Sequence, residues 1–421
     1  MDKQGTTAEN RLKRIEKNEN KNEERPERSN AAAPEPNGGG KPDKGMALFG
    51  RAETKEQRQS RTAENQTEPR AGSRSDLCEY RLSELTALFS ELGEPKYRAA
   101  QVYGWLHQRL VRDFSEMSNL PKALRERLSA QFRIAEAEPL EVLVSKIDGT
   151  RKYVLRLYDG NVIEAVLMRY HHGNSVCIST QVGCRMGCRF CASTLDGCVR
   201  NLSASEMLAQ IYTITRDTGE RVSNVVMMGS GEPLDNFDEA VRFIQMVSDE
   251  NGLNISQRNI TLSTCGLVPK IRELAELDLQ ITLALSLHAA SKQVREEIMP
   301  VAKAYALPDV LAACRDYHEK TGRRLTFEYS VVRGVNDTQE EAEKLSRLLR
   351  GMHGHVNLIP VNPIRERSFE SPDRGTVEAF RDVLEKNGIA VTIRREMGRD
   401  ISSACGQLRR RFADHAGMCT D

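Results

Sequence analysis

The sequence predicts an α/β protein: a partial or complete (β/α) barrel, preceded by a small N-terminal helical accessory module and a disordered N-terminal tail. Seven short apolar runs lie between residues 176 and 394, and helical stretches separate most of them. Such alternation is typical of βαβ units that build a parallel sheet. The first 75 residues are instead polar and rich in charge, which indicates chain without a core.

The barrel elements follow from the hydrophobic pattern. The predicted strands are 176–180, 224–229, 260–264, 281–287, 325–331, 356–360 and 391–394. The predicted helices are 204–216, 236–249, 268–277, 307–320, 338–350 and 375–387. Ser203 and Glu206 form a capping box for the first of them. A doubly wound sheet is the alternative, although no Gly-rich phosphate fingerprint follows the first strand.

Three segments precede the barrel. Residues 1–75 carry 16 Lys and Arg against 13 Asp and Glu, with Phe49 as their only aromatic residue, so they cannot bury enough apolar surface to fold. Residues 76–136 show helical periodicity and form the accessory module. Residues 137–170 alternate with period two, and their Asp-Gly pairs predict hairpin turns and a β-hairpin connector.

These boundaries assign residues 171–410 to the barrel and 411–421 to a C-terminal tail. The length of 421 residues suits two or three domains. A net charge of +1 excludes a uniformly basic nucleic-acid coat. No apolar run approaches the ~20 residues of a membrane span, and the polar N-terminus is no secretory signal. Ten cysteines in such a chain do not indicate a disulfide scaffold, so we expect a cytoplasmic protein with metal-binding or catalytic thiols.

Three cysteines cluster just past the first predicted barrel strand: Cys184, Cys188 and Cys191. Thiolates at this spacing can converge on one metal centre and suit an iron–sulfur cluster or zinc. Zinc normally needs four protein ligands, and Cys198 is then the candidate for the fourth. Three cysteine ligands favour a cubane cluster. Three of its four irons would then each bind a cysteine, and the fourth iron would stay open to bind another molecule.

Several ordered motifs accompany the cysteines. They are Cys177-Ile-Ser-Thr-Gln-Val-Gly-Cys184, Met228-Gly-Ser-Gly-Glu-Pro-Leu234, Leu262-Ser-Thr-Cys-Gly266, Ser286-Leu-His-Ala289, Asn357-Leu-Ile-Pro-Val-Asn-Pro363 and Ala404-Cys-Gly-Gln-Leu408. Together they resemble the RNA adenine-C2 methyltransferases of the RlmN type, within the radical S-adenosylmethionine superfamily. The likeness covers about residues 80–410. Cys265 stands where relatives carry serine, which puts nothing essential in doubt.

The resemblance implies a radical S-adenosylmethionine barrel with a 4Fe-4S cluster held by Cys184, Cys188 and Cys191. It also implies two S-adenosylmethionine molecules per turnover. The residues expected to bind this cofactor are Gly231, Glu232, Ser263, Ser286, Leu287, His288 and Asn362. Without the resemblance, Glu232 is as well explained by capping a turn, and His288 by packing in the core.

The resemblance also implies three catalytic residues. Cys405 would take a methyl group from one S-adenosylmethionine, and a radical from the second would activate that methyl group to attack adenine. Cys177 would then release the RNA by forming a transient disulfide with Cys405. Glu164 matches the family's proton acceptor, although an exposed strand residue explains its position equally well.

The expected substrates are an adenine of 23S rRNA at the peptidyl transferase centre and the adenine 3′ of the anticodon in tRNA. A flavodoxin-like electron donor and a monomeric state are expected too. A basic patch either holds RNA phosphates or forms a solvated face; its members are Arg394, Arg395, Arg399, Arg409, Arg410 and Arg411, with Arg323, Arg324 and Arg333. We expect the accessory module 76–136 to help bind folded RNA by its shape. One rival function is adenine-C8 methylation of 23S rRNA, the antibiotic-resistance type. Another is a zinc-stapled RNA-binding protein without catalysis.

Overall fold

The computed structural model describes residues 74–364 and 366–401, all within one of the two compact units into which the chain divides. The predicted tail, except for its last two residues, therefore lies outside the described residues. So do Cys405 and the predicted C-terminal tail 411–421. None of the helices in the described part is long and apolar enough to cross a membrane.

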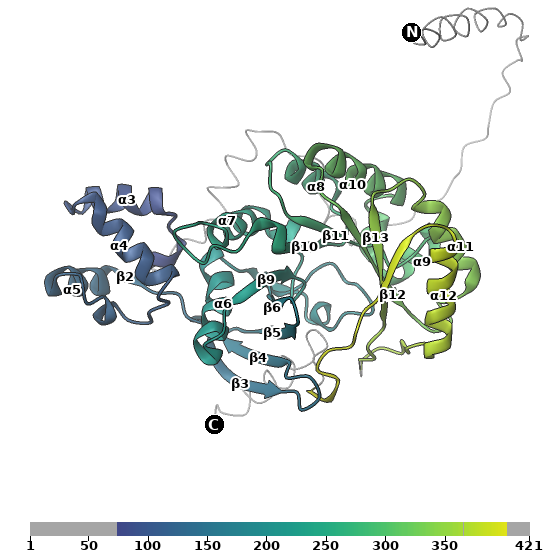
Figure 1. Ribbon diagram of the computed structural model, residues 1–421, viewed down its shortest axis with the longest axis horizontal. Coiled ribbons are helices and arrows are strands. Elements are labelled where there is room, and N and C mark those ends of the chain that lie inside the picture. Colours follow the sequence, from purple (N-terminus) through teal and green to yellow (C-terminus); the bar gives the residue numbers. More distant parts are fainter. Residues whose placement is uncertain (1–73, 365, 402–421) are drawn as a thin grey trace, which may run out of the picture. The chain divides into compact units, whose positions relative to one another are not determined.

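Ten strands form one sheet in the order β14-β13-β12-β11-β10-β9-β6-β5-β4-β3 (Figure 1). Seven of them pair in parallel, as the alternating pattern predicts. They are β6 (Gly173–Cys177), β9 (Val222–Met227), β10 (Ile260–Thr264), β11 (Thr282–Ser286), β12 (Leu325–Val331), β13 (Gly354–Pro360) and β14 (Ala390–Ile393). The doubly wound alternative fails, because these strands follow one another across the sheet in sequence order.

The barrel is partial in the described residues, because its outer strands β3 and β14 do not pair with each other. Hydrogen bonds nevertheless link the segment after β14 to the turn after β3. Ser145 Oγ donates to Asp400 Oδ1 (2.6 Å), and the backbone N–H of Gly398 donates to Asp148 Oδ2 (2.9 Å). The chain leading toward residue 405 is therefore fastened to the opposite edge of the sheet.

The predicted hairpin connector is part of the barrel sheet. It consists of β3 (Glu138–Val144), β4 (Arg151–Arg156) and β5 (Val162–Tyr170), which pair antiparallel. Asp148-Gly149 and Asp159-Gly160 lie in the turns between them, as expected. Because β5 also pairs with β6, the three strands prolong the parallel sheet. We call β3–β5 the antiparallel arm.

Helices follow the parallel strands and pack on the outer face of the sheet (Figure 1). They are α6 (Ala204–Thr218), α7 (Phe237–Val247), α8 (Val268–Ala275), α9 (Lys292–Ile298), α10 (Leu307–Thr321), α11 (Gln339–Leu348) and α12 (Arg374–Lys386). The capping box of Ser203 and Glu206 is confirmed at the start of α6. The short helix α9 and a small hairpin, β7 (Gln181–Gly183) with β8 (Cys198–Asn201), were not predicted.

The two faces of the sheet differ in chemistry. Alternate strand residues such as Leu283, Leu285 and Leu358 belong to the main hydrophobic core with the helices. The register aligns Ser286, Glu328, Asn357 and Thr392 across four strands on the other face. A polar stripe therefore lines the inside of the barrel, where an ordinary closed core would be apolar.

The accessory module contains the three predicted helices, α3 (Leu82–Glu91), α4 (Lys96–His107) and α5 (Lys122–Gln131). Two short strands frame it, β1 (Ser75–Asp76) and β2 (Phe132–Arg133). The hydroxyl group of Tyr103 donates to Asp249 Oδ2 (3.1 Å), and His107 hydrogen-bonds with Tyr212 of α6. Burial lowers the pKa of His107 to about 4, so this joint contains a neutral imidazole.

Candidate active site

Most of the predicted site residues gather at the carboxyl edge of the parallel strands. Parallel strands all end at the same edge of a sheet, and the loops beyond them form the active sites of β/α proteins. The cysteine loop follows β6 and β7, Gly231 and Glu232 follow β9, and Leu287 and His288 follow β11. One edge therefore collects these residues from distant parts of the chain.

The cysteine loop is compact and held by its own backbone. The N–H of Cys184 donates to the carbonyl of Gly197 (2.8 Å), and the N–H of Cys191 donates to the carbonyl of Cys188 (3.1 Å). Thr194 Oγ1 donates to the carbonyls of Cys188 and Cys191. Cys184 and Cys188 are buried, and Cys191 is half-buried. Three thiols therefore lie within one hydrogen-bonded loop.

Burial raises the pKa values of the Cys184 and Cys188 thiols well above the usual range of a cysteine. Repulsion from the neighbouring thiolates raises both pKa values further. A bound cation reverses such a shift, because a coordinating thiol is deprotonated outright. Thiolates are the ligands that hold iron–sulfur clusters, so the donor set of the cysteine loop fits such a cluster.

Gly231 brings the loop after β9 against the cysteine-bearing segment. Its φ is 111°, and a Cβ there would lie 2.7 Å from the backbone nitrogen and the Cβ of Gln181. The side-chain oxygen of Gln181 accepts a hydrogen bond from the N–H of Glu232 (2.8 Å). Only glycine permits this close approach, which places Glu232 beside the start of the cysteine loop.

Glu232 is buried, and backbone N–H groups hold both of its carboxylate oxygens. Oε2 accepts from Cys265 (2.8 Å) and Oε1 accepts from Leu234 (3.2 Å). Burial raises the pKa of this carboxyl group. Glu232 therefore caps the turn that follows, and the same contacts fix its carboxylate at the edge of the sheet with lone pairs left over for an ammonium group.

The ends of β10 and β11, with the loop after β11, continue the site. Ser263 Oγ and Ser286 Oγ lie 3.3 Å apart. His288 has a φ of 55°, and its Nδ1 accepts a hydrogen bond from the N–H of Ser330 (2.9 Å). Its ring contacts that of Phe190, inside the cysteine loop, with centroids 4.7 Å apart. Burial lowers the pKa of His288 to about 3, so the ring is neutral. Leu287 is fully buried.

Asn362 is placed less tightly. It lies two residues beyond the end of β13, at the same edge of the sheet, and its side chain is exposed. The polar stripe of the barrel interior includes Asn357, which lies on the same strand, β13. The structure therefore puts Asn362 on the predicted edge without joining it to the serine pair.

Glu164 and Cys177 lie inside the barrel. The register pairs Val166 with Cys177, and Glu164 lies two residues before Val166 on the same face of β5. Glu164 is only 7% exposed, so the alternative of an exposed strand residue is wrong. Cys177 packs in a small apolar cluster with Met168 and Met397. Met397 precedes Cys405 by eight residues, and Cys405 itself lies outside the described residues.

Two charged residues of the barrel interior could not be identified from the sequence. Lys152 of β4 is fully buried, and its Nζ lies 3.4 Å from Glu164 Oε2. Glu328 of β12 is also buried, and its Oε2 accepts a hydrogen bond from Asn357 Nδ2 (2.8 Å). Burial raises the pKa of Glu328. Neither residue belongs to a recognisable motif. Their position inside the barrel becomes evident only from the register of the strands.

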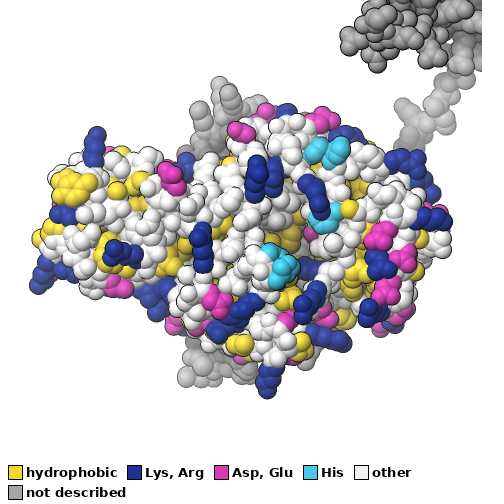
Figure 2. All heavy atoms as spheres, in the orientation of Figure 1, with side chains coloured by type: hydrophobic (Ala, Val, Ile, Leu, Met, Phe, Trp, Pro, Cys, Tyr) yellow, Lys and Arg dark blue, Asp and Glu magenta, His cyan; other side chains and the backbone are white. Residues whose placement is uncertain are grey.

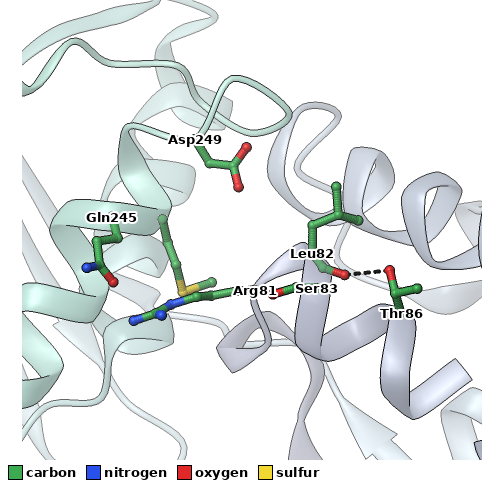
Figure 3. A pocket seen from close by; sticks show the side chains of 7 residues that line it. Arg81, Leu82, Ser83, Thr86, Gln245 and Asp249 are labelled. Atoms are coloured by element: carbon green, nitrogen blue, oxygen red, sulfur yellow. Dashed lines mark hydrogen bonds between the residues drawn. The ribbon is translucent and has the colours of Figure 1, made fainter.

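A pocket of about 540 Å³ lies elsewhere, between α3 and the end of α7 (Figure 3). Its lining includes Arg81, Gln245 and Asp249. A helix that follows a parallel strand returns the chain to the amino edge of the sheet, so the last turn of α7 lies away from the cysteine loop. This pocket belongs to the joint between the accessory module and the barrel.

Basic side chains are scattered over the face shown in Figure 2, with acidic ones among them. Two members of the predicted basic patch are already paired: Arg333 with Glu370 (3.2 Å), and Arg399 with Glu396 (3.8 Å). The arginines at 409–411 lie outside the described residues. The described part of the predicted basic patch is therefore as compatible with a solvated face as with phosphate binding.

Comparison with known proteins places the chain in a family. Residues 75–134 match the model of the "Ribosomal RNA large subunit methyltransferase N-terminal domain", and residues 178–348 match that of the "Radical SAM superfamily". A protein of Lachnoclostridium phytofermentans, named "Probable dual-specificity RNA methyltransferase RlmN", is 60% identical over 339 residues, which are 80% of this chain and 95% of the relative. This chain belongs to the RlmN family of radical S-adenosylmethionine RNA methyltransferases.

Two further proteins support the assignment. One of the same name from Lachnospira eligens is 57% identical over 81% of this chain and 97% of its own. A crystal structure of a radical SAM methyltransferase from Sphaerobacter thermophilus has a TM-score of 0.77 at 42% identity, over 79% of this chain and 98% of that one. Membership of the radical S-adenosylmethionine superfamily implies a 4Fe-4S cluster and S-adenosylmethionine, which the thiols of the cysteine loop fit.

Proposed function

We propose that this RlmN-family chain methylates C2 of an adenine in 23S rRNA, at the peptidyl transferase centre, and of the adenine 3′ of the anticodon in tRNA. The names of its relatives, which specify dual-specificity RNA methyltransferases, support two kinds of RNA substrate. The match to a ribosomal RNA large subunit methyltransferase domain supports rRNA as one of them. The observation that carries the proposal is that Glu164 and Cys177, from separate strands, share the inner face of a barrel whose edge bears the cysteine loop.

Cys184, Cys188 and Cys191 would hold the cluster. Gly231, Glu232, Ser263, Ser286, Leu287, His288 and Asn362 would bind S-adenosylmethionine at the edge of the sheet. When bound, the cluster and cofactor supply a carbon-centred radical and take back one electron. The carboxylate of Glu232 can bind the amino group of the cofactor, because two backbone N–H groups hold the carboxylate in position.

The remaining steps belong to residues of this chain, with two S-adenosylmethionine molecules consumed per turnover. Cys405 accepts the methyl group of the first, and after activation by the second its carbon bonds to adenine C2. Glu164 takes the C2 proton. Cys177 then attacks the sulfur of Cys405: a disulfide forms, the carbon–sulfur bond breaks, and the released carbon takes a proton to become the methyl group. A flavodoxin-like donor supplies the electrons that start the reaction, and two further electrons reduce the disulfide.

The test is anaerobic reconstitution with an RNA fragment, followed by nucleoside analysis. We expect 2-methyladenosine in both substrate types. 8-Methyladenosine would support the C8 rival, and a colourless protein without iron would support the zinc-stapled rival.

Two variants test the thiol chemistry. Cys405→Ala should make no methylated RNA, because it lacks the methyl acceptor. Cys177→Ala should accumulate a covalent protein–RNA adduct, seen as RNA of retarded mobility on a denaturing gel. Cys314→Ala is the matched control, because Cys314 is buried in α10 away from the barrel interior and should leave methylation unchanged. Normal methylation by Cys405→Ala would contradict the proposed role.

A further inference from the structure

A lysine is buried inside the barrel beside the proposed proton acceptor. The side chain of Lys152 is 0% exposed, and its Nζ lies 3.4 Å from Glu164 Oε2, whose side chain is 8% exposed. The two residues lie on neighbouring strands, β4 and β5, in the antiparallel arm. A fully buried lysine is rare in proteins and calls for a partner and a reason.

Strand register places this pair next to Cys177. Lys152 lies directly opposite Val166, and Val166 lies directly opposite Cys177 on its other side. Residues opposite one another across a sheet project from the same face. Glu164 is two residues from Val166 and shares that face too. Lys152, Glu164 and Cys177 therefore occupy one corner of the barrel interior, on three neighbouring strands.

The rest of this corner is largely apolar. Cys177 packs with Met168 and Met397, and Val166 and Met228 border the same cluster. Val154, directly opposite Glu164, is fully buried. Removing two charges from water costs several kcal/mol per ion before their attraction offsets it, so an ion pair here is a poor way to stabilise the fold. A role in the chemistry of the site explains it better.

We propose that Lys152 is a positioning residue for the methyl transfer: its ammonium group orients the Glu164 carboxylate and balances its charge, so that Glu164 can take the proton from adenine C2. This inference rests on the proposed function. In the step concerned, the C2–H bond of the protein-linked adenine breaks. Its proton moves to a carboxylate oxygen of Glu164, and its electron pair stays in the purine ring.

The experiment measures that proton directly. An RNA fragment with deuterium at C2 of the target adenine is incubated with the reconstituted enzyme, and release of deuterium into water is followed in single turnovers. We expect Lys152→Met to release deuterium about 100-fold more slowly than wild type, the lower end of what a positioned general base contributes. Lys152→Arg, which keeps the charge, should stay within about tenfold of wild type. Formation of 5′-deoxyadenosine should be unchanged in both.

A double-mutant comparison separates positioning from a general structural effect. Glu164→Gln and Lys152→Met/Glu164→Gln should be equally slow, because Lys152 acts only through Glu164. Lys344→Met is the matched control, since Lys344 pairs with the buried Glu341 (2.9 Å) on the outer helix α11 and should release deuterium at the wild-type rate. If Lys152→Met alone fails to keep its iron, the charge-neutral double variant still gives the comparison with Glu164→Gln.

Three results would overturn the inference: wild-type deuterium release by Lys152→Met, a double variant more than tenfold slower than Glu164→Gln, or a Lys152→Arg variant as slow as Lys152→Met. Failure of the proposed function looks different, because the wild-type enzyme would then release no deuterium and make no 2-methyladenosine.

Discussion

The carboxyl-edge loops and the antiparallel arm build the two halves of the candidate site by different means. In the loops, functional side chains lie close together in sequence, and hydrogen bonds to the backbone hold them in place. Thr194 donates to a backbone carbonyl of the cysteine loop, and two backbone N–H groups donate to Glu232. In the arm, Lys152 and Glu164 come from separate strands and are held by register and by each other's charge.

The difference has a chemical consequence. Under the proposed function, the loops would present ligands to a metal cluster and a zwitterionic cofactor, so rigid backbone geometry suits them. The arm would hold and move a proton in an apolar corner, and a balanced ion pair would provide that without a metal. A substitution in the loops should therefore remove a cofactor, whereas one in the arm should slow a single step.

The largest effect is expected in the cysteine loop. Cys184→Ser should bind no more than traces of iron after anaerobic reconstitution and should make no methylated RNA, because a serine hydroxyl is a poor ligand for a cluster of soft thiolate coordination. Iron content, the brown absorption of the protein and nucleoside analysis measure the outcome.

Cys198→Ser is the matched control. Cys198 lies opposite Gly183 in the β7–β8 hairpin, next to Cys184, and it is the fourth ligand that a zinc site would need. Full iron content in this variant would support a three-cysteine cluster. Loss of the metal from both variants would instead support four-thiolate coordination, and the open iron on which the proposed chemistry depends would be gone.

A moderate effect is expected where the loop after β9 meets the cysteine-bearing segment. Gly231→Ala should weaken S-adenosylmethionine binding at least tenfold, because the new Cβ would collide with Gln181, which holds the N–H of Glu232. Its positive φ adds backbone strain of about 1 kcal/mol. Equilibrium dialysis with labelled cofactor measures the change.

Gly160→Ala separates strain from collision. Gly160 has a similar positive φ of 84°, but nothing lies within 4 Å of the position where its Cβ would be. We expect this variant to lose a little thermal stability and to bind cofactor as wild type does. Equal losses of binding in both variants would show that the close approach at Gly231 has no particular role.

Much of the fold could be predicted because its signals are local. Apolar runs separated by amphipathic helices identify parallel strands wherever they pair, and all seven strands are present in the structure. The antiparallel arm could be predicted as hairpins but not as a part of the barrel sheet. Alternation of apolar and polar residues indicates a strand with two different faces, but it does not indicate which strands pair. The pairing of β5 with β6 could therefore not be predicted.

The candidate site divides in the same way. Cys184, Cys188, Cys191, Gly231 and Glu232 stand in short motifs, so resemblance identifies them. Lys152 follows Arg151 in a strand with charged residues at both ends, and Glu328 sits in an apolar run, so neither gives a local signal. Their burial depends on pairings between distant strands, which the sequence alone does not specify.

The smallest effect is expected outside both halves of the site, in the accessory module. His107 is buried, and its folded pKa of about 4 lies below the ordinary value of 6.5. Between these values only the unfolded chain takes up the proton, so the contribution of His107 to stability is full above pH 6.5 and falls as the pH drops toward 4. The slope is at most about 1.4 kcal/mol per pH unit, or roughly 1 kcal/mol by pH 5.5.

His107→Gln isolates this contribution, because glutamine does not titrate. Asp76, whose pKa burial raises to about 7, changes stability with pH in the opposite direction, but it is present in both proteins and cancels in their difference. Denaturant unfolding at pH 7.5 and pH 5.5 should show the advantage of wild type over His107→Gln shrinking by roughly 1 kcal/mol at the lower pH. A difference that does not vary with pH would mean that His107 has the same pKa in the folded and unfolded chains, so that burial does not keep its imidazole neutral.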